Sequence, residues 1–449
     1  MRVFMLGWEF PPFISGGLGT ACYGLTKAMS SIGTDILFVL PRPVSTPFST
    51  HLRLVSPRPG SPLAAPTTEF RLDEFERVTF RTINAAIGDP YLSAEDYEER
   101  ARTSTAQGAP AGDKPYLVQN PGEVPRTVGS GKPPSDHYGG DLFNEIQRYA
   151  ALAAEVARGE SFEIVHAHDW MTFPAGMAVA ALKGVPLVVH VHSTEFDRSG
   201  VHVDSRIYDI ERRGMHAAIK VIAVSYLTKN LITHHYGINP GKVEVVYNAI
   251  ESNGNGFDEE KYSIHKDEKI VLFLGRITMQ KGPEYFLAAA KKVLEVMDNV
   301  KFVMAGSGDM IRRTIEMAAA MGIGHKVLFT GFLRGGDVEK VFRMADLYVM
   351  PSVSEPFGIA PLEAMSHDVP VIISKQSGVS EVLTHALKVD FWDVNEMANK
   401  IIAVLKHPPL ASTLRQHGSF EVARMSWTDA ARACVQVYDQ AVGAMNGRH

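Results

Sequence analysis

Two series of short apolar runs, each alternating with helical patterns, constrain the fold of this chain more than any other feature. In the first series, Val3–Leu6 leads into a glycine-rich loop, a helical segment at about 21–31 and a second apolar run at Ile36–Leu40. A second series starts at Ile270–Leu274. Buried strands that alternate with helices are typical of parallel sheets covered by helices. The sequence therefore predicts an α/β protein with two doubly wound, Rossmann-like domains that face a central cleft.

The other expected strands continue this alternation. In the first series they are Ile164–Ala167, Pro186–His192, Val221–Val224 and Val243–Tyr247, and in the second Val300–Ala305, Val327–Thr330, Leu347–Met350 and Val369–Ser374. A short run at 78–86, inside the proline-rich stretch described next, could form a further strand.

Changes in composition divide the chain. More than half of its 26 prolines lie between Pro41 and Gly140, which predicts an insertion of about 41–140 whose role we leave open. A loop at 251–267, rich in Asn, Gly and charge, predicts a domain boundary. We therefore expect domains over 1–255 and 256–425 and a C-terminal helix within 426–449.

Size and charge exclude several classes of protein. The chain has 449 residues, 45% hydrophobic and 21% charged, with a net charge of −5 and no long basic run, so nucleic acid is not expected as a partner. Two distant cysteines, Cys22 and Cys434, fit a reducing cytoplasm. The first residues reach an acid too soon for a signal peptide, and no apolar run approaches the ~20 residues of a spanning helix.

Glu355 and Glu363 flank the start of an expected helix. The segment Ser354–Met365 follows a strand, continues through a turn at Phe357-Gly358, and has Pro361 where a first helical turn tolerates it. Free backbone N–H groups there can hold an anion, while the two carboxylates can accept hydroxyl hydrogens. This pattern indicates a nucleotide-sugar site, although Glu363 could also merely stabilise the helix N-terminus.

Two further loops end strands of the predicted sheets. Arg276 and Lys281 follow the strand at Ile270–Leu274 and are placed to hold a diphosphate. Gly16-Gly17-Leu18-Gly19 opens the first helix and lets a ligand approach its N–H groups. Its spacing is not Gly-x-Gly-x-x-Gly, which argues against a dinucleotide-binding oxidoreductase.

Histidine pairs end two neighbouring strands of the first series. His166 and His168 precede Asp169 and Trp170, and His190 and His192 end the next strand of the series. Strand geometry places both members of a pair on one face. Such pairs could bind a metal, but neutral histidines and an acid that bind sugar hydroxyls explain the pattern better.

Together these motifs resemble the retaining glycosyltransferases of family four, also called group 1, which have the GT-B fold. The resemblance implies that Arg276 and Lys281 hold the donor diphosphate, that Glu355 contacts the transferred sugar, and that Glu363 binds the ribose. Phe357, Gly358 and Ile359 would contribute backbone amides to the donor site. The C-terminal helix is expected to cross back to the first domain.

The first half also resembles bacterial glycogen and starch synthases. By that resemblance Gly17 contacts the donor, Gly16, Leu18, His168 and Trp170 lie on the acceptor side, and His192 holds the glucose 6-hydroxyl, with Asp169 as a further catalytic residue. Two departures stand out: Ile14 replaces a lysine of those synthases, and they lack a glutamate at the position of Glu363.

The expected reaction is transfer of a glucosyl unit from ADP- or UDP-glucose to a glucan end, with retention and without a metal or other cofactor. Sucrose, a sugar phosphate or a lipid remain alternative acceptors. A catalytically silent nucleotide-sugar-binding protein and a metal-dependent hydrolase built on the histidine pairs are alternatives of other classes. The sequence leaves the nucleotide base and the oligomeric state open.

Overall fold

The structure is a computed structural model that describes residues 1–10, 17–41, 67–70, 77–83, 140–251 and 268–447. Most of the described residues belong to one compact unit within 1–85 and 146–449. Two β-sheets lie in this unit.

The first sheet has eight strands in the order β3-β4-β2-β1-β5-β6-β7-β8. All neighbours are parallel except β3 and β4. Its strands are β1 (Arg2–Leu6), β2 (Asp35–Leu40), β3 (Thr67–Phe70), β4 (Val78–Ile83), β5 (Ile164–His168), β6 (Leu187–Val191), β7 (Lys220–Ala223) and β8 (Val243–Val245). The strand order reverses between β1 and β5, and ligands of such sheets bind beyond the carboxyl ends of the strands at that point.

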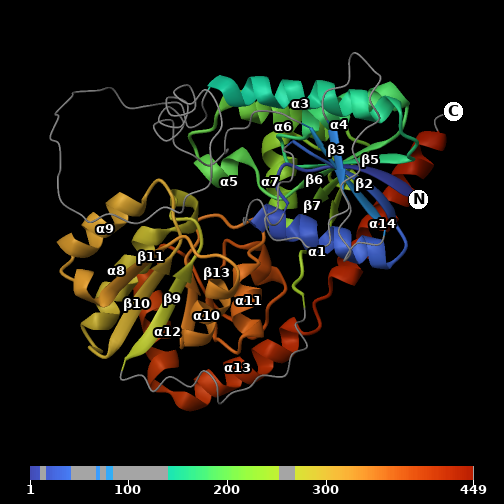
Figure 1. Ribbon diagram of the computed structural model, residues 1–449. Helices are drawn as coiled ribbons and strands as arrows, with labels where there is room; N and C mark the ends of the chain where they lie inside the picture. Colours follow the sequence, from blue (N-terminus) through green and yellow to red (C-terminus); the bar gives the residue numbers. More distant parts are fainter. Residues whose placement is uncertain (11–16, 42–66, 71–76, 84–139, 252–267, 448–449) are drawn as a thin grey trace, which may run out of the picture. The chain divides into compact units, whose positions relative to one another are not determined.

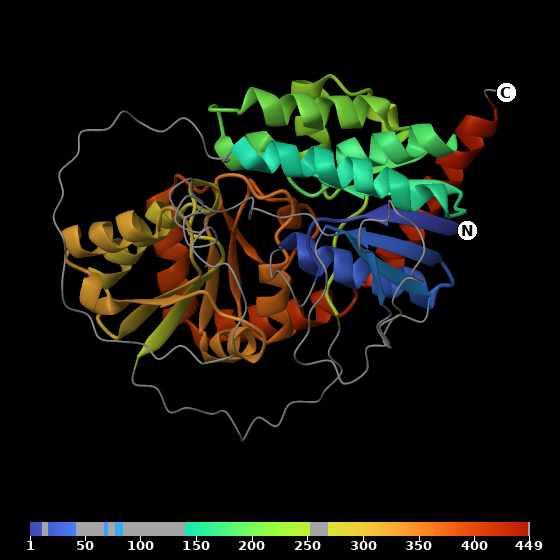
Figure 2. The ribbon, with the colours of Figure 1, turned by 45° about the horizontal axis from the view of Figure 1, so that its top comes forward.

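Helices cover both faces of this sheet (Figures 1 and 2). One face carries α3, α4 and α6, and the other carries α1 and α14, whose side chains share one core with the strands. The helices that follow these strands are α1 (Gly17–Ser31), α3 (Gly140–Arg158), α4 (Phe173–Lys183), α5 (Glu195–Ser199), α6 (Ser205–Ala217), α7 (Tyr226–Tyr236) and the short η1 (Pro240–Lys242).

The second sheet has six parallel strands in the order β11-β10-β9-β12-β13-β14. They are β9 (Lys269–Leu274), β10 (Val300–Ala305), β11 (Val327–Gly331), β12 (Leu347–Met350), β13 (Val371–Ser374) and β14 (Leu387–Val389). The order reverses between β9 and β12, so both strands aim their carboxyl ends at the natural ligand site.

Separate apolar clusters fill the two faces of the second sheet, as expected for strands buried on both sides. The covering helices are η3 (Met279–Lys281), α8 (Pro283–Leu294), α9 (Ile311–Ala320), η4 (Gly324–Lys326), α10 (Gly336–Met344), α11 (Ala360–Ser366), η5 (Gly378–Glu381), α12 (Val394–Lys406) and α13 (Pro408–Val422).

The last helix, α14 (Trp427–Asn446), packs on the first sheet and not on the second. Trp427 fills the space above Gly24 of α1, where an added Cβ would lie 2.3 Å from the indole ring. Tyr438 is fully buried farther along the helix. The chain therefore crosses from its second half back to its first.

The predicted fold class is confirmed: both halves are doubly wound α/β sheets. Strands β10 and β12 have the predicted bounds, whereas α1 begins four residues before the expected start. The predicted boundary at 255/256 and most of the insertion at 41–140 lie outside the described residues. None of the helices in the described ranges has the length and apolar character that a membrane span needs.

Candidate active site

Lys281 and Glu355 meet at the carboxyl ends of β9 and β12. Lys281 ends η3, which follows β9, and its ammonium forms an ion pair with the carboxylate of Glu355. Ser352 donates a second hydrogen bond to the same carboxylate oxygen at 3.1 Å. Glu355 is 6% exposed, so the pair is shielded from solvent on the carboxylate side. A charge buried to this degree is stable only when it is paired.

Backbone contacts fix the position of Glu355. Its N–H donates to Gln376 at 2.9 Å, and its carbonyl accepts from Gly378 at 2.9 Å, which pins the loop to the segment after β13. Gly358 then turns the chain with φ +100°, and a Cβ there would lie 3.1 Å from the Glu355 side chain. Only glycine adopts this conformation without strain. The predicted turn at Phe357-Gly358 thus holds the carboxylate in place.

Glu363 lies one turn into α11, where it was predicted. Its side chain is half-buried, and burial raises the pKa of its carboxyl group to about 7. Glu355 and Glu363 both contribute to a raised pKa of Tyr348 on β12, after the larger effect of burial. Both carboxylates therefore lie near enough to Tyr348 to act on it, and among the described residues Glu355 has Lys281 as its cation partner.

The loop that carries Arg276 is held by a second glycine loop. A Cβ added to Gly306 would lie 1.9 Å from the carbonyl oxygen of Gly275. A Cβ added to Gly308 would lie 2.3 Å from the carbonyl oxygen of Ile277. The stem of Lys281 approaches Gly275 on the other side. The glycines after β10 therefore serve close packing, and Arg276 is half-buried.

The four histidines of the first domain gather at the carboxyl ends of β5 and β6. His166, His168, His190 and His192 continue the face that Ile164 and Val188 begin, with ring centroids of neighbours 4.1–5.4 Å apart.

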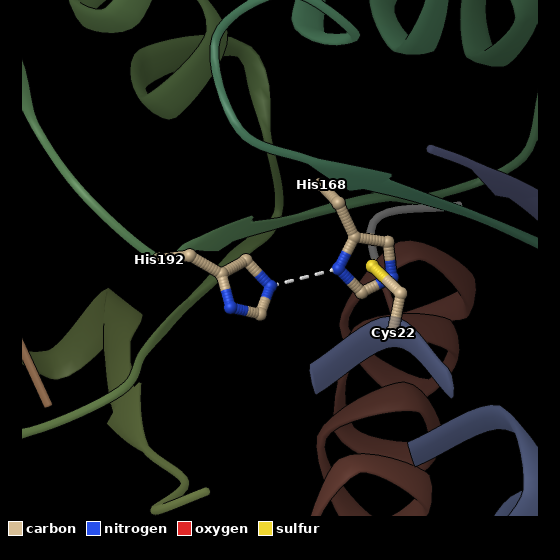
Figure 3. A group of neighbouring side chains, drawn as sticks. All are labelled: Cys22, His168 and His192. Atoms are coloured by element: carbon tan, nitrogen blue, oxygen red, sulfur yellow. Dashed lines mark hydrogen bonds between the residues drawn. The ribbon is translucent and has the colours of Figure 1, made fainter. Parts of the chain in front are cut away.

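Each histidine of this cluster is held neutral. Burial lowers the pKa of His166 and of His192 to about 3 and lowers the pKa of His168 and His190 well below the usual value. His168 Nδ1 and His192 Nε2 share a hydrogen bond of 2.9 Å (Figure 3). Of the four, His192 alone is half-exposed, so it is the ring that can reach a ligand.

Asp169 positions the loop that carries His192. Its Oδ1 accepts hydrogen bonds from the backbone N–H of His192 at 2.7 Å and of Ser193 at 3.4 Å. Burial raises the pKa of Asp169 to about 7 even though these N–H groups favour its charged form. Its φ of +58° is rare for a non-glycine residue. The predicted catalytic acid is thus placed to act through His192.

A capped helix extends this loop toward the second domain. Thr194 and Asp197 form a capping box at the start of α5. The other carboxylate oxygen of Asp197 accepts a hydrogen bond of 2.5 Å from Ser354, the residue before Glu355. The segment from His192 to Asp197 therefore ends against the loop that holds Glu355, which links the two predicted halves of the site.

Arg198 is already neutralised by carboxylates. Its guanidinium bonds to Glu195 at 3.1 Å and to Glu211 at 2.6 Å, and Tyr236 also donates to Glu211. All are buried or nearly so. The cation next to the His192 loop is thus committed to the protein.

Three residues predicted for the first-domain site have other roles or lie outside the structure. Trp170 is 2% exposed and offers no ring face to an acceptor, contrary to the prediction. Leu18 is a core residue of α1, also contrary to the acceptor-side prediction. Gly17 begins α1 and is exposed, as a donor contact requires. Gly16 lies outside the described residues.

Sequence reasoning missed Asp197, Arg198, Glu211 and Ser354. The Thr194-x-x-Asp197 spacing is a capping-box signal that could have located the start of α5. No local pattern could have paired Asp197 with Ser354, because 157 residues separate them.

Comparison with known protein families identifies the family to which this chain belongs. The model for glycosyl transferases group 1 matches residues 255–419, and the model for glycosyltransferase family 4 matches residues 107–253. An uncharacterized glycosyltransferase of Methanocaldococcus jannaschii is 34% identical over 303 residues, which cover 64% of this chain and 77% of that protein. The chain is a group 1 glycosyltransferase.

Other similarities extend over nearly the whole of this glycosyltransferase. A glycogen synthase of Mycobacterium tuberculosis is 24% identical over 446 residues, covering 98% of this chain and 94% of the relative. A sucrose-phosphate synthase from Thermosynechococcus elongatus has a similar fold, with a TM-score of 0.70 at 18% identity over 99% of both chains.

Proposed function

We propose that this glycosyltransferase moves a glucosyl unit from ADP- or UDP-glucose to the end of an α-1,4-glucan, with retention of configuration. The observation that carries the proposal is the Lys281–Glu355 pair at the point where the second sheet reverses its strand order. A cation beside a carboxylate suits a donor whose diphosphate carries negative charge and whose sugar carries hydroxyl donors.

The donor would bind along the carboxyl ends of β9 and β12. Lys281 and Arg276 would stabilise the charge that grows on the leaving diphosphate. The backbone N–H groups of Gly358 and Ile359 donate to no other described backbone group and could join them. Glu363 would accept hydrogen bonds from the ribose, since its carboxylate has no side-chain partner among the described residues.

Bond exchange would occur on one face of the sugar. The acceptor hydroxyl oxygen forms its bond to the anomeric carbon from the side on which the bond to the diphosphate oxygen breaks. The acceptor proton passes to a phosphate oxygen of the leaving group, so no protein nucleophile is needed. Glu355 would favour the positive charge on the sugar, and neutral His192, fixed by Asp169, would hold a sugar hydroxyl.

A glucan acceptor is favoured over a phosphorylated one. A sugar phosphate needs a free cation, but Arg198 on the His192 side of the site is bonded to Glu195 and Glu211. The similarity to a glycogen synthase over 98% of this chain supports the same choice. The sugar-phosphate alternative predicts that activity appears with an acceptor such as fructose 6-phosphate.

Transfer is also proposed to be independent of a metal ion, because Arg276 and Lys281 can supply the positive charge that a metal would give. Protein dialysed against EDTA should keep its activity. A reversible loss that Mg²⁺ or Mn²⁺ restores would contradict this part of the proposal. A cytoplasmic location belongs to the proposal too, and the free thiols of Cys22 and Cys434 fit it.

Two substitutions divide the roles of the glutamates. Glu363→Ala should raise the Kd for the nucleoside diphosphate, because it removes only ribose contacts. Glu355→Ala should lower kcat more than nucleotide affinity, because it faces the reacting sugar. Equal effects of both substitutions on nucleotide affinity would refute this assignment.

A further inference from the structure

We infer that Cys22, His168 and His192 form a binding site for one soft or borderline metal ion such as Zn²⁺, at the carboxyl end of the first sheet. One donor atom of each residue lies within 4.8 Å of the others. Figure 3 shows the Cys22 thiol of α1 over the His168 ring and His192 hydrogen-bonded to that ring. This site does not depend on the proposed function.

The donor set fits Zn²⁺. Thiolate and imidazole are ligands that Zn²⁺ prefers, and three protein ligands leave one position open for water or a hydroxyl group. Bond lengths of about 2.3 Å to sulfur and 2.0–2.1 Å to nitrogen require donor atoms roughly 3.3–3.6 Å apart. His168 Nδ1 and His192 Nε2 are already 2.9 Å apart, and the thiol must approach by at most about 1.5 Å.

Unpartnered ring nitrogens surround the cluster, whereas the two nitrogens that would bind the metal, His168 Nδ1 and His192 Nε2, are hydrogen-bonded to each other. Among the described residues, Nε2 of His168 and Nδ1 of His192 have no hydrogen-bond partner, and neither do three further ring nitrogens of His166 and His190. Buried polar atoms of folded proteins usually have partners. Neutral rings keep lone pairs free for a metal, whereas protonated ones would repel it.

Charge around the thiol also favours a cation. The carboxylates of Asp169 and Glu9 lie near the Cys22 thiol. Those carboxylates offset part of the cost of placing a dication in this buried site.

A metal ion bound at this site would block glucosyl transfer. This consequence rests on the proposed function, because His192 is the ring that would hold the donor sugar. Zn²⁺ should then inhibit the enzyme, and Cys22→Ser should raise the inhibitory concentration at least tenfold while leaving the basal rate within about twofold.

The binding test uses the full chain without a histidine tag, freed of metal by EDTA and titrated with Co²⁺. The wild type should bind one equivalent and show thiolate-to-cobalt charge-transfer absorption, which requires a cysteine ligand. Cys22→Ser should lose that absorption and bind at least tenfold more weakly. Cys434→Ser is the matched control, because it removes the other buried thiol and should change neither property.

Two results would overturn the site. One is the absence of charge-transfer absorption in the wild type, which needs no variant to fold. The other is equal Co²⁺ binding by wild type and a Cys22→Ser protein whose circular dichroism is native. Inhibition can fail without harm to the binding site: Co²⁺ binding with unchanged transfer would remove only the link to His192 as the sugar contact.

Discussion

Replacing Lys281 by methionine tests whether the Lys281–Glu355 pair is the core of the donor site. The substitution keeps the length of the side chain and removes its charge. Glu355, 6% exposed, would keep the hydroxyl of Ser352 as its one side-chain hydrogen-bond partner within the described part of the chain. A buried carboxylate that loses its charged partner lowers the free energy of unfolding by about 1–3 kcal/mol. The 21% exposure of Lys281 places the loss at the lower end, about 1–2 kcal/mol in the free energy of unfolding.

The effect on catalysis should be larger than the effect on stability. A group that stabilises charge only in the transition state is worth about 3 kcal/mol, so kcat/KM for the donor should fall roughly a hundredfold or more. The assay follows nucleotide release at a temperature where circular dichroism shows the variant to be folded. Lys375→Met is the control: it removes an exposed lysine paired with Asp390 at 2.8 Å and should change kcat/KM less than about twofold.

A second substitution separates the two effects. Glu355→Gln in the Lys281→Met background removes the unpaired charge and should recover part of the lost stability without recovering activity. If Lys281→Met alone keeps kcat/KM within about threefold of the wild type, the assignment of the donor diphosphate to this pair is wrong.

Three further predictions concern single positions. Donor affinity should fall up to about tenfold between pH 8 and pH 6, because Glu363, with a pKa of about 7, gains a proton and ceases to be a charged acceptor. In Glu363→Gln, the donor Kd measured by calorimetry should no longer depend on pH over this range. Asparagine at position 169 tolerates the positive φ, but Asp169→Asn weakens the hydrogen bonds that fix the loop after β6. We therefore expect kcat to fall about tenfold while nucleotide affinity stays within twofold. An unchanged kcat would contradict the positioning role of Asp169. Gly24→Ala should cost about 1–3 kcal/mol by overpacking against Trp427, whereas Gly443→Ala, with open space at its Cβ, should not destabilise; equal urea midpoints would contradict this packing.

The fold could be predicted because each buried strand carries its own apolar signal. Val300–Ala305 and Leu347–Met350 are continuous apolar or nearly apolar runs bounded by turns, and both strands formed with those bounds. β14 was not predicted, since Leu387–Val389 has three residues and is only partly buried. Local pattern thus suffices for central strands and fails at the sheet edge.

The candidate site was predictable only where its members are close in sequence or end neighbouring strands. Glu355 and Glu363 are separated by one turn and a short helix start, and the structure has Glu355 in the loop before α11 and Glu363 in the first turn of that helix. Trp170 was placed wrongly because a single aromatic residue after a strand gives no sign of which way the chain turns. The contact of Asp197 with Ser354 arises from tertiary structure alone.

The central claim is glucosyl transfer to a glucan, and product length tests it most directly. Metal-free protein is incubated with ADP-glucose or UDP-glucose and a maltooligosaccharide labelled at its reducing end, and the products are separated by size. The account predicts a ladder of longer α-1,4-linked glucans that β-amylase degrades, and no ladder with Lys281→Met. No elongation with any nucleotide-glucose donor, together with activity on a sugar phosphate or a lipid, would contradict it.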